Sequence, residues 1–148
     1  IFALMLRSAE QETPMPIGQD APAATHRRRR RGCRLHRRGL AHSVECRDGG
    51  GVLVGGLYGV CIGGLFAGES MFHRAADASK VALVALDALV LTPSRPQAVI
   101  DTQWSTEHLA SLGVRELPRG AYAERLHEAL ALPQPDLARA DLPVGWPA

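Results

Sequence analysis

Hydrophobic and polar positions divide the chain into recognisable elements from about residue 34 onward. Residues 41–47 alternate between apolar and polar side chains and predict a strand, and the Gly-rich stretch 48–51 predicts a turn. Two apolar segments, 52–58 and 65–66, lie on either side of Gly63-Gly64. This arrangement predicts a two-stranded hairpin closed by a glycine turn.

The next part of the chain predicts a helix followed by a short strand. Ala and Leu dominate residues 81–90, so we expect a helix that begins at Asp77 or Ser79. The segment 92–97 contains two prolines and should end this helix. Residues 98–103 then predict a short strand.

The last periodic region predicts two helices around one more strand. Ser105 or Thr106 can cap a short helix that ends at Gly113, and residues 114–117 are a strand candidate. Residues 119–132 predict an amphipathic helix with one apolar face, formed by Tyr122, Leu126 and Leu130. Strands alternating with helices indicate a mixed α/β class for a domain spanning residues 34–132.

The two ends of the chain lack such periodicity. Residues 1–33 are interrupted by prolines and lead into Arg27–Arg31, so we assign them no domain and expect a disordered or non-native segment. Residues 133–148 contain four prolines and are expected to form a peripheral tail.

Composition adds a lopsided charge to this picture. The 148 residues are 46% hydrophobic and 22% charged, as in ordinary soluble domains. Residues 1–44 carry a net charge of +6 and residues 45–148 a net charge of −4. The arginines of residues 27–38 could attract phosphates, but no aromatic residue lies among them to stack on bases. The alternative for this segment is a solvated tail.

The uncharged stretch 51–68 raises the question of a membrane span. Gly55, Gly59 and Gly63 are spaced every fourth residue, as in packed transmembrane helices. However, seven of its eighteen residues are glycine, each of which costs a helix about 1 kcal/mol relative to alanine. The hairpin is therefore the favoured interpretation.

Three cysteines, Cys33, Cys46 and Cys61, form neither a disulfide framework nor a metal-binding spacing. Reduced thiols in a cytoplasmic protein are the expected state. His42, His73 and His108 likewise lack a second ligand at metal-binding spacing, and we expect them to be structural or surface residues.

Several short motifs, taken in order and spacing, resemble the bacterial leucyl/phenylalanyl-tRNA–protein transferases over roughly residues 34–130. The motifs are Ala-His-Ser-Val-Glu at 41–45, Val-Gly-Gly-Leu-Tyr-Gly-Val at 54–60, Phe-Ala-Gly-Glu-Ser-Met-Phe at 66–72, Ile-Asp-Thr-Gln at 100–103, His-Leu-Ala-Ser-Leu-Gly at 108–113 and Glu-Leu-Pro-Arg at 116–119.

The resemblance implies a catalytic domain similar to the GNAT acyltransferases, with a mixed sheet flanked by helices. Such enzymes move Leu, Phe or Met from aminoacyl-tRNA to proteins that begin with Arg or Lys, which marks those proteins for degradation. The resemblance implies no metal or coenzyme A. We expect no membrane partner, because the hairpin is favoured over a membrane span for residues 51–68. The N-terminal domain of the family is not recognisable here, so we expect a truncated or frameshifted chain.

Asp101 and Gln103 are the candidate catalytic residues. They are two residues apart on a predicted strand, so their side chains should point to the same face. A carboxylate beside an amide can orient that amide and accept a proton from an incoming amine. The resemblance gives both residues this role. The alternative is a strand end at which they cap the following turn.

Substrate binding is expected from one carboxylate and a group of mostly apolar residues. Glu69 could bind the acceptor's amine or guanidinium, or the terminal ribose of the tRNA; alternatively it pairs with Arg74. The resemblance implies an apolar pocket lined by Leu57, Met71, Leu83, Leu86 and Ile100. Ser70 is a further binding candidate, and Tyr58 could stack or hydrogen-bond near the site. The apolar members could instead be ordinary core, and Tyr58 a buried structural residue.

Two other functions remain open on sequence alone. One is a non-catalytic RNA-binding module that uses the arginine-rich segment. The other is a GNAT-like enzyme with a different acyl donor, although no Gly-rich coenzyme A loop is recognisable.

Overall fold

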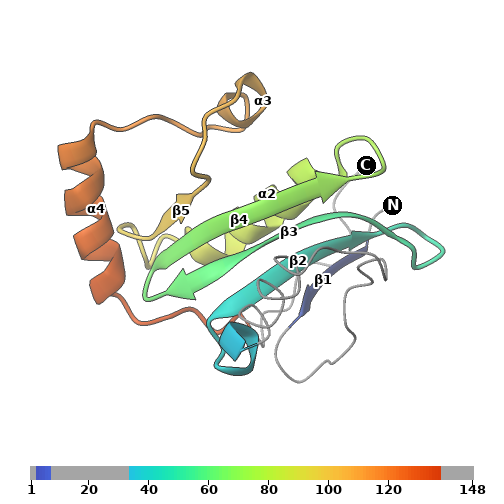
Figure 1. The fold of residues 1–148 in the computed structure, drawn as a ribbon, viewed down its shortest axis with the longest axis horizontal. Helices are drawn as coiled ribbons and strands as arrows, with labels where there is room; N and C mark the ends of the chain where they lie inside the picture. Colours follow the sequence, from blue (N-terminus) through green and yellow to red (C-terminus); the bar gives the residue numbers. More distant parts are fainter. Residues whose placement is uncertain (1–2, 8–33, 138–148) are drawn as a thin grey trace, which may run out of the picture.

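In the described part of the chain, five strands form a single sheet, with helices on one face and at one end (Figure 1). The computed structural model describes residues 3–7 and 34–137. The elements in chain order are β1 Ala3–Arg7, β2 Ala41–Arg47, β3 Leu53–Ile62, β4 Leu65–His73, α2 Ala78–Val90, β5 Val99–Asp101, α3 Glu107–Ala110 and α4 Arg119–Ala131. The expectations for Arg27–Arg31, Cys33 and residues 138–148 lie outside the described residues.

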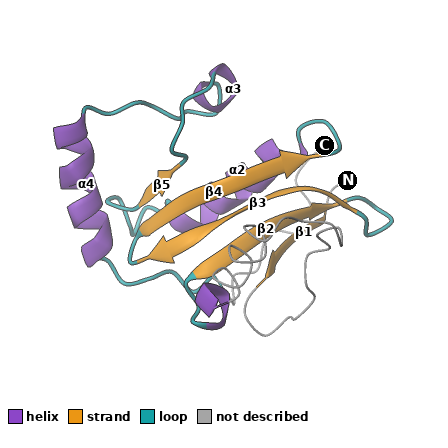
Figure 2. Cartoon of the chain, viewed as in Figure 1, coloured by secondary structure: helices purple, strands orange, loops and turns teal. Residues whose placement is uncertain are grey.

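The sheet has the order β1-β2-β3-β4-β5, with antiparallel pairs except for the parallel pair β4–β5. A parallel pair needs a crossover connection, and α2 supplies it. Figure 2 shows α2 across one face of the sheet, with α4 beyond β5. The predicted mixed α/β class and mixed sheet flanked by helices are confirmed. The likeness to GNAT enzymes stays a prediction.

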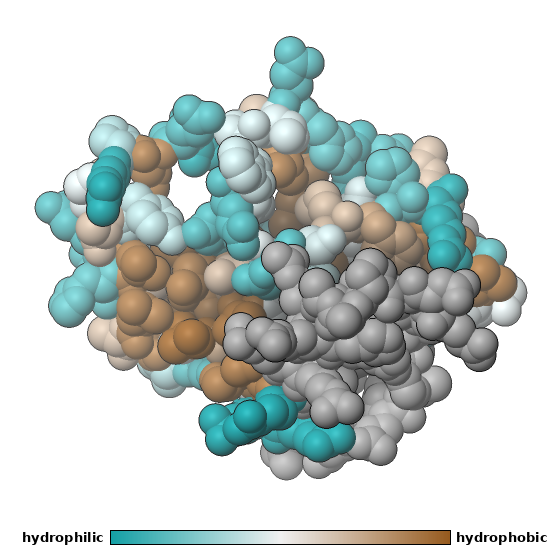
Figure 3. Space-filling model, viewed as in Figure 1, coloured by the Kyte–Doolittle hydropathy of each residue, from teal (hydrophilic) through white to brown (hydrophobic). Residues whose placement is uncertain are grey.

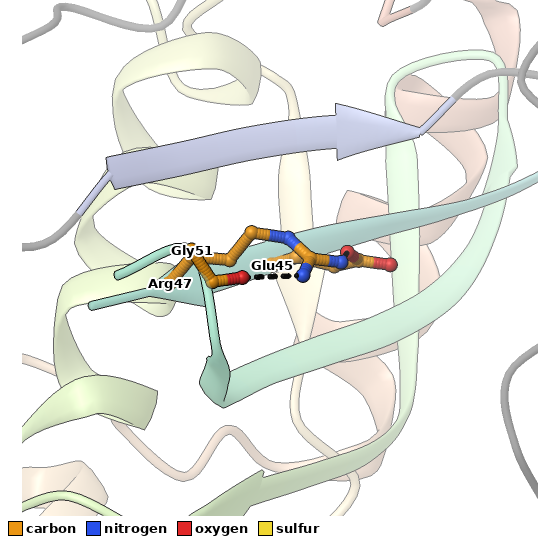
Figure 4. Close-up of polar contacts among 3 residues, drawn as sticks. All are labelled: Glu45, Arg47 and Gly51. Atoms are coloured by element: carbon orange, nitrogen blue, oxygen red, sulfur yellow. Dashed lines mark hydrogen bonds and ion pairs between the residues drawn. The ribbon is translucent and has the colours of Figure 1, made fainter. Parts of the chain in front are cut away.

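The predicted strand 41–47 is confirmed as β2, and one buried ion pair fixes its end. Glu45 is buried, and its Oε2 accepts a hydrogen bond from Arg47 Nη2 at 2.8 Å. Arg47 Nη1 also donates to the carbonyl of Gly51 at 2.9 Å (Figure 4). In the predicted turn, Asp48 Oδ1 accepts the backbone N–H groups of Gly50 and Val52. The turn between β2 and β3 is thereby held by side chains as well as by backbone.

The hairpin prediction is confirmed, and its strands are longer than expected. Gly63 turns the chain with a φ of 58°, which favours glycine. A Cβ on Gly59 would lie 2.3 Å from the Ala67 carbonyl oxygen and 2.4 Å from Phe66 Cε1. The glycine at position 59 therefore permits close packing between β3 and β4. Within the part of the chain described, no helix is both long and apolar enough to cross a membrane.

Helix α2 buries its small and aliphatic side chains against the sheet. Its buried residues join side chains from β2, β3 and β4 in one core that includes Val44, Leu57, Cys61, Phe66, Ala82, Leu83, Leu86 and Val90. The helix begins at Ala78, so Asp77 occupies the predicted cap position. Its side chain makes no capping bond and pairs instead with Lys80 at 2.6 Å.

The structure corrects three expectations about elements. Residues 114–117 are not a strand, because the sheet ends at the three-residue β5 and no described strand lies beside them. In α4, Tyr122 and Leu126 are half-buried as the amphipathic pattern predicts, but Leu130 is exposed and Ala129 is buried in its place. Residues 3–7 lie in the segment expected to be disordered or non-native, but they pair with β2 as a strand.

Apolar side chains also gather on the surface over the turn end of β3 and β4, beside α4 (Figure 3). Ile62 and Leu130 are exposed in this part of the molecule. The turn itself touches the end of α4, since Gly64 N–H donates to the Ala129 carbonyl at 2.7 Å.

Candidate functional site

A cavity of about 380 Å³ opens between the bulged part of β4, helix α2 and the loop after β5. Its walls include eight residues that the sequence predicted as site residues: Leu57, Glu69, Ser70, Met71, Leu83, Leu86, Ile100 and Gln103. They come from four different elements and from the loop after β5, so only the tertiary fold brings them together. The cavity is the natural place to look for function, because most binding sites are concave and largely preformed.

Glu69 lies at the cavity because β4 contains a bulge. Tyr58 pairs with Ser70 and Gly59 pairs with Gly68, which leaves Glu69 as an extra residue without a cross-strand partner. Bulges redirect side chains and are common beside active sites. Glu69 is exposed, and its carboxylate makes no hydrogen bond or ion pair with any described residue. The alternative of an ion pair with Arg74 is therefore wrong, and the carboxylate is available to a ligand.

Gln103 reaches the cavity by a different route from the one expected. Strand β5 ends at Asp101, so the expectation that both side chains leave one face of a strand is wrong. Gln103 instead adopts a left-handed conformation with a φ of 63°. Its Nε2 donates to the Gly68 carbonyl at 2.6 Å, next to the bulge. The amide is thereby fixed at the wall of the cavity.

Asp101 is half-buried beside Gln103 and does not line the cavity. Its Oδ1 accepts the backbone N–H of Gln103 at 2.7 Å, so the turn-capping interpretation of this residue is observed. Its Oδ2 accepts the Tyr122 hydroxyl at 2.6 Å. This hydrogen bond to Asp101 raises the pKa of the Tyr122 phenol, because the carboxylate favours the protonated form.

Tyr58 is the predicted binding residue that the structure places elsewhere. Neighbouring residues on a strand point to opposite faces, and Leu57 faces the cavity. Tyr58 is 47% exposed and lines a smaller hollow of about 100 Å³ together with Ser43 and Glu45. The alternative of a buried structural tyrosine is wrong, and a binding role for Tyr58 stays a prediction.

Several lining residues were not predicted from the sequence: Phe66, Gly68, Thr102, Trp104, Thr106, His108 and Leu109. Most of them follow β5 directly, where the loop and α3 close over the cavity. Trp104 is 76% exposed at its rim. Thr106 was predicted as a helix cap, and its Oγ1 does accept Leu109 N–H at 3.1 Å. The sequence signal for Trp104, Thr106, His108 and Leu109 was their position shortly after the Asp-Thr-Gln motif.

His108 has a position that the sequence did not predict. It is exposed, as expected, but it also lines the cavity beside Glu69 and Gln103. No group of three or more His, Cys, Asp or Glu residues within the described ranges could hold a metal ion. Cys46 and Cys61 are free and buried, and burial raises the pKa of the Cys61 thiol to about 11.

The cavity is apolar inside and polar at its mouth. Aliphatic and aromatic side chains form the interior, where Leu86 and Phe66 are fully buried. Carboxylate, amide, hydroxyl and imidazole groups lie among the more exposed residues. Such an arrangement can hold an apolar group as large as an aromatic side chain while polar atoms of the same ligand stay at the mouth. Met71 can adapt its flexible side chain to differently shaped guests.

Comparison with known proteins identifies one family over the part of the chain that contains the motifs. The family model described as leucyl/phenylalanyl-tRNA protein transferase matches residues 25–127. The transferase of Phenylobacterium zucineum is 56% identical over 99 residues, which are 67% of this chain and 43% of that protein. The transferase of Rubrobacter xylanophilus is 53% identical over 66% of this chain and 50% of its own length. That of Caulobacter vibrioides is 57% identical over 67% and 44%. The chain thus spans half or less of these curated relatives.

Proposed function

Because this chain belongs to the leucyl/phenylalanyl-tRNA–protein transferase family, we propose that it transfers an apolar amino acid from aminoacyl-tRNA to a protein. The amino acid is Leu, Phe or Met, and the acceptor is the α-amine of a protein that begins with Arg or Lys. The observation that carries this proposal is the apolar cavity with a polar mouth. Its volume of about 380 Å³ suits a leucine or phenylalanine side chain.

The cavity would orient the ester for attack. With the amino-acid side chain held among Leu83, Leu86 and Ile100, the ester carbonyl lies toward the mouth, near Gln103. The acceptor amine attacks the carbonyl carbon, a C–N bond forms, and the C–O bond to the tRNA ribose breaks. The amine loses a proton and the ribose oxygen gains one. Holding the two reactants together supplies much of the acceleration in such reactions.

Gln103 is suited to guide the amine. Because its Nε2 already donates to the Gly68 carbonyl, its Oε1 remains as an acceptor for an N–H of the attacking amine. Asp101 acts behind Gln103, where its carboxylate caps the Gln103 backbone and places a negative charge near the developing positive charge on nitrogen. Both catalytic assignments are therefore kept, with Gln103 as the residue closer to the reacting atoms.

Glu69 supplies the charge for the acceptor. Its unpaired carboxylate lies at the mouth, where the guanidinium or ammonium of an N-terminal Arg or Lys would arrive. A ribose hydroxyl of the tRNA end is the other group it could bind. Ser70 and Met71 follow it on β4 and complete this wall of the cavity.

The cellular role and the compartment complete the proposal. The new N-terminal residue would mark the acceptor protein for degradation, in the cytoplasm where aminoacyl-tRNA is found. We assign no metal or coenzyme to the transfer, in keeping with the resemblance.

A peptide assay tests this proposal. The chain is mixed with Leu-tRNA and a peptide that begins with Arg, and the mass of the product is measured by mass spectrometry. We expect the mass of one leucine residue to be added to this peptide and not to a matched peptide that begins with Asp. Absence of product with intact Leu-tRNA would overturn the proposal. Acetylation of the peptide from acetyl-coenzyme A in a parallel arm would favour the GNAT-like alternative.

A further inference from the structure

A hydrogen bond from Tyr122 on α4 reaches the loop that carries Gln103. We propose that Tyr122 is a positioning residue, which fixes the Asp101 carboxylate so that Gln103 keeps its left-handed conformation at the cavity wall. This inference rests on the proposed function only where it concerns the rate of transfer. The positioning itself concerns only the contacts among Tyr122, Asp101 and Gln103, which do not depend on the proposed function.

The Asp101 carboxylate has a separate partner for each oxygen. Oδ1 accepts Gln103 N–H at 2.7 Å and Oδ2 accepts the Tyr122 hydroxyl at 2.6 Å. Without the second bond, the carboxylate could rotate about its terminal torsion, which is broad for aspartate. The Tyr122 hydroxyl therefore determines the plane of the group that caps Gln103.

Gln103 depends on that cap because its backbone conformation is unfavourable. It is one of two non-glycine residues with a positive φ in the described chain, the other being Asp77. A left-handed conformation costs a residue with a Cβ roughly 1–2 kcal/mol. Two hydrogen bonds offset this cost, one from the backbone N–H to Asp101 and one from Nε2 to the Gly68 carbonyl. Weakening the bond to Asp101 should also free the side-chain amide of Gln103 from the Gly68 carbonyl.

Helix α4 is attached to the sheet at two places. At its C-terminal end, the Ala129 carbonyl accepts Gly64 N–H at 2.7 Å, and Ala129 is the fully buried residue of the helix. In its first half, the Tyr122 hydroxyl makes the contact with Asp101. Removing that hydroxyl should leave the helix anchored through Ala129 while freeing the Asp101 carboxylate.

Tyr122→Phe in the full chain tests the proposal, because it removes one oxygen and keeps the ring. The first readout is the ¹⁵N NMR signals of Gln103, from its backbone amide and its side-chain amide. We expect both to shift, and hydrogen exchange at the backbone amide to accelerate about tenfold. Leu126→Ala trims the same helix face and keeps the Tyr122 hydrogen bond to Asp101, so it should leave these signals unchanged. Glu128→Gln, which breaks only the exposed pair with Arg125, is the second control.

The second readout is transfer of leucine. We expect kcat to fall about tenfold in Tyr122→Phe, with KM for Leu-tRNA within twofold of wild type, since the aminoacyl cavity is intact. Unchanged Gln103 signals in Tyr122→Phe, or equal shifts in Leu126→Ala, would overturn the positioning role. If the wild-type chain transfers no leucine, the proposed function fails, while the NMR result still decides whether Tyr122 positions Gln103.

Discussion

Gly59→Ala should loosen the sheet where it borders the cavity. The added Cβ would lie 2.3 Å from the Ala67 carbonyl oxygen and 2.4 Å from Phe66 Cε1. The carbonyl belongs to the β3–β4 ladder and cannot move without weakening it, and Phe66 is fully buried. Overpacking of this kind costs about 1–3 kcal/mol, and a weakened ladder hydrogen bond about 1 kcal/mol more. We therefore expect a loss of about 2–4 kcal/mol in the free energy of unfolding.

Urea unfolding followed by circular dichroism measures this loss. Gly120→Ala is the matched control, because nothing outside its own helix lies within 4 Å of the added Cβ. In α4 this change should raise the free energy of unfolding by up to about 1 kcal/mol. Both substitutions add one methyl group, but Gly59→Ala should lower the free energy of unfolding and Gly120→Ala should raise it. A Gly59→Ala variant as stable as wild type would refute the packing argument for β3 and β4.

Four further predictions follow from the site and the core. Met71 is 37% exposed on the cavity wall. Met71→Ala should change the ratio of Leu to Phe transfer several-fold, measured by paired transfer assays. Urea unfolding should show that the free energy of unfolding changes by less than about 1 kcal/mol. Glu69→Gln should raise KM for an Arg-starting peptide about tenfold and leave unfolding unchanged; a constant KM would remove Glu69 from acceptor binding. Burial lowers the pKa of His42 below its ordinary value of 6.5, so the folded state favours the neutral ring. The free energy of unfolding should then decline as the pH falls below about 6.5, and less steeply in His42→Gln; parallel slopes would contradict this. Because the pKa of Cys61 is about 11, iodoacetamide at pH 8 should modify it in urea and spare it in the folded chain, which mass spectrometry can resolve.

Local sequence signals predicted much of the sheet and its first helix. The alternation at 41–47, the glycine pair at 63–64 and the Ala/Leu run at 81–90 each act over a few residues, and each element formed as expected. Residues 114–117 failed as a strand because strand formation needs a neighbour, which an alternating pattern cannot supply.

The site was predicted by its motifs more than by its geometry. Most apolar lining residues were identified through the family resemblance, yet Glu69 reaches the cavity through a bulge, which depends on the register with β3. Gln103 reaches it through a left-handed turn capped by Asp101, and not through strand alternation. Trp104 and His108 line the cavity only because the loop after β5 folds back over α2 and β4. These features arise from contacts between distant segments, which a single sequence does not reveal.

In the proposed reaction, the Gln103 amide guides the attacking amine at the mouth of an aminoacyl cavity. The most direct test is single-turnover transfer of leucine from Leu-tRNA to an Arg-starting peptide by wild type and Gln103→Gly. Glycine is chosen because it accepts a φ of 63° without strain, so the backbone turn is kept and only the amide is removed. We expect a transfer rate lower by about 100-fold in Gln103→Gly, with unchanged urea unfolding. Equal transfer rates in the two proteins would contradict this expectation.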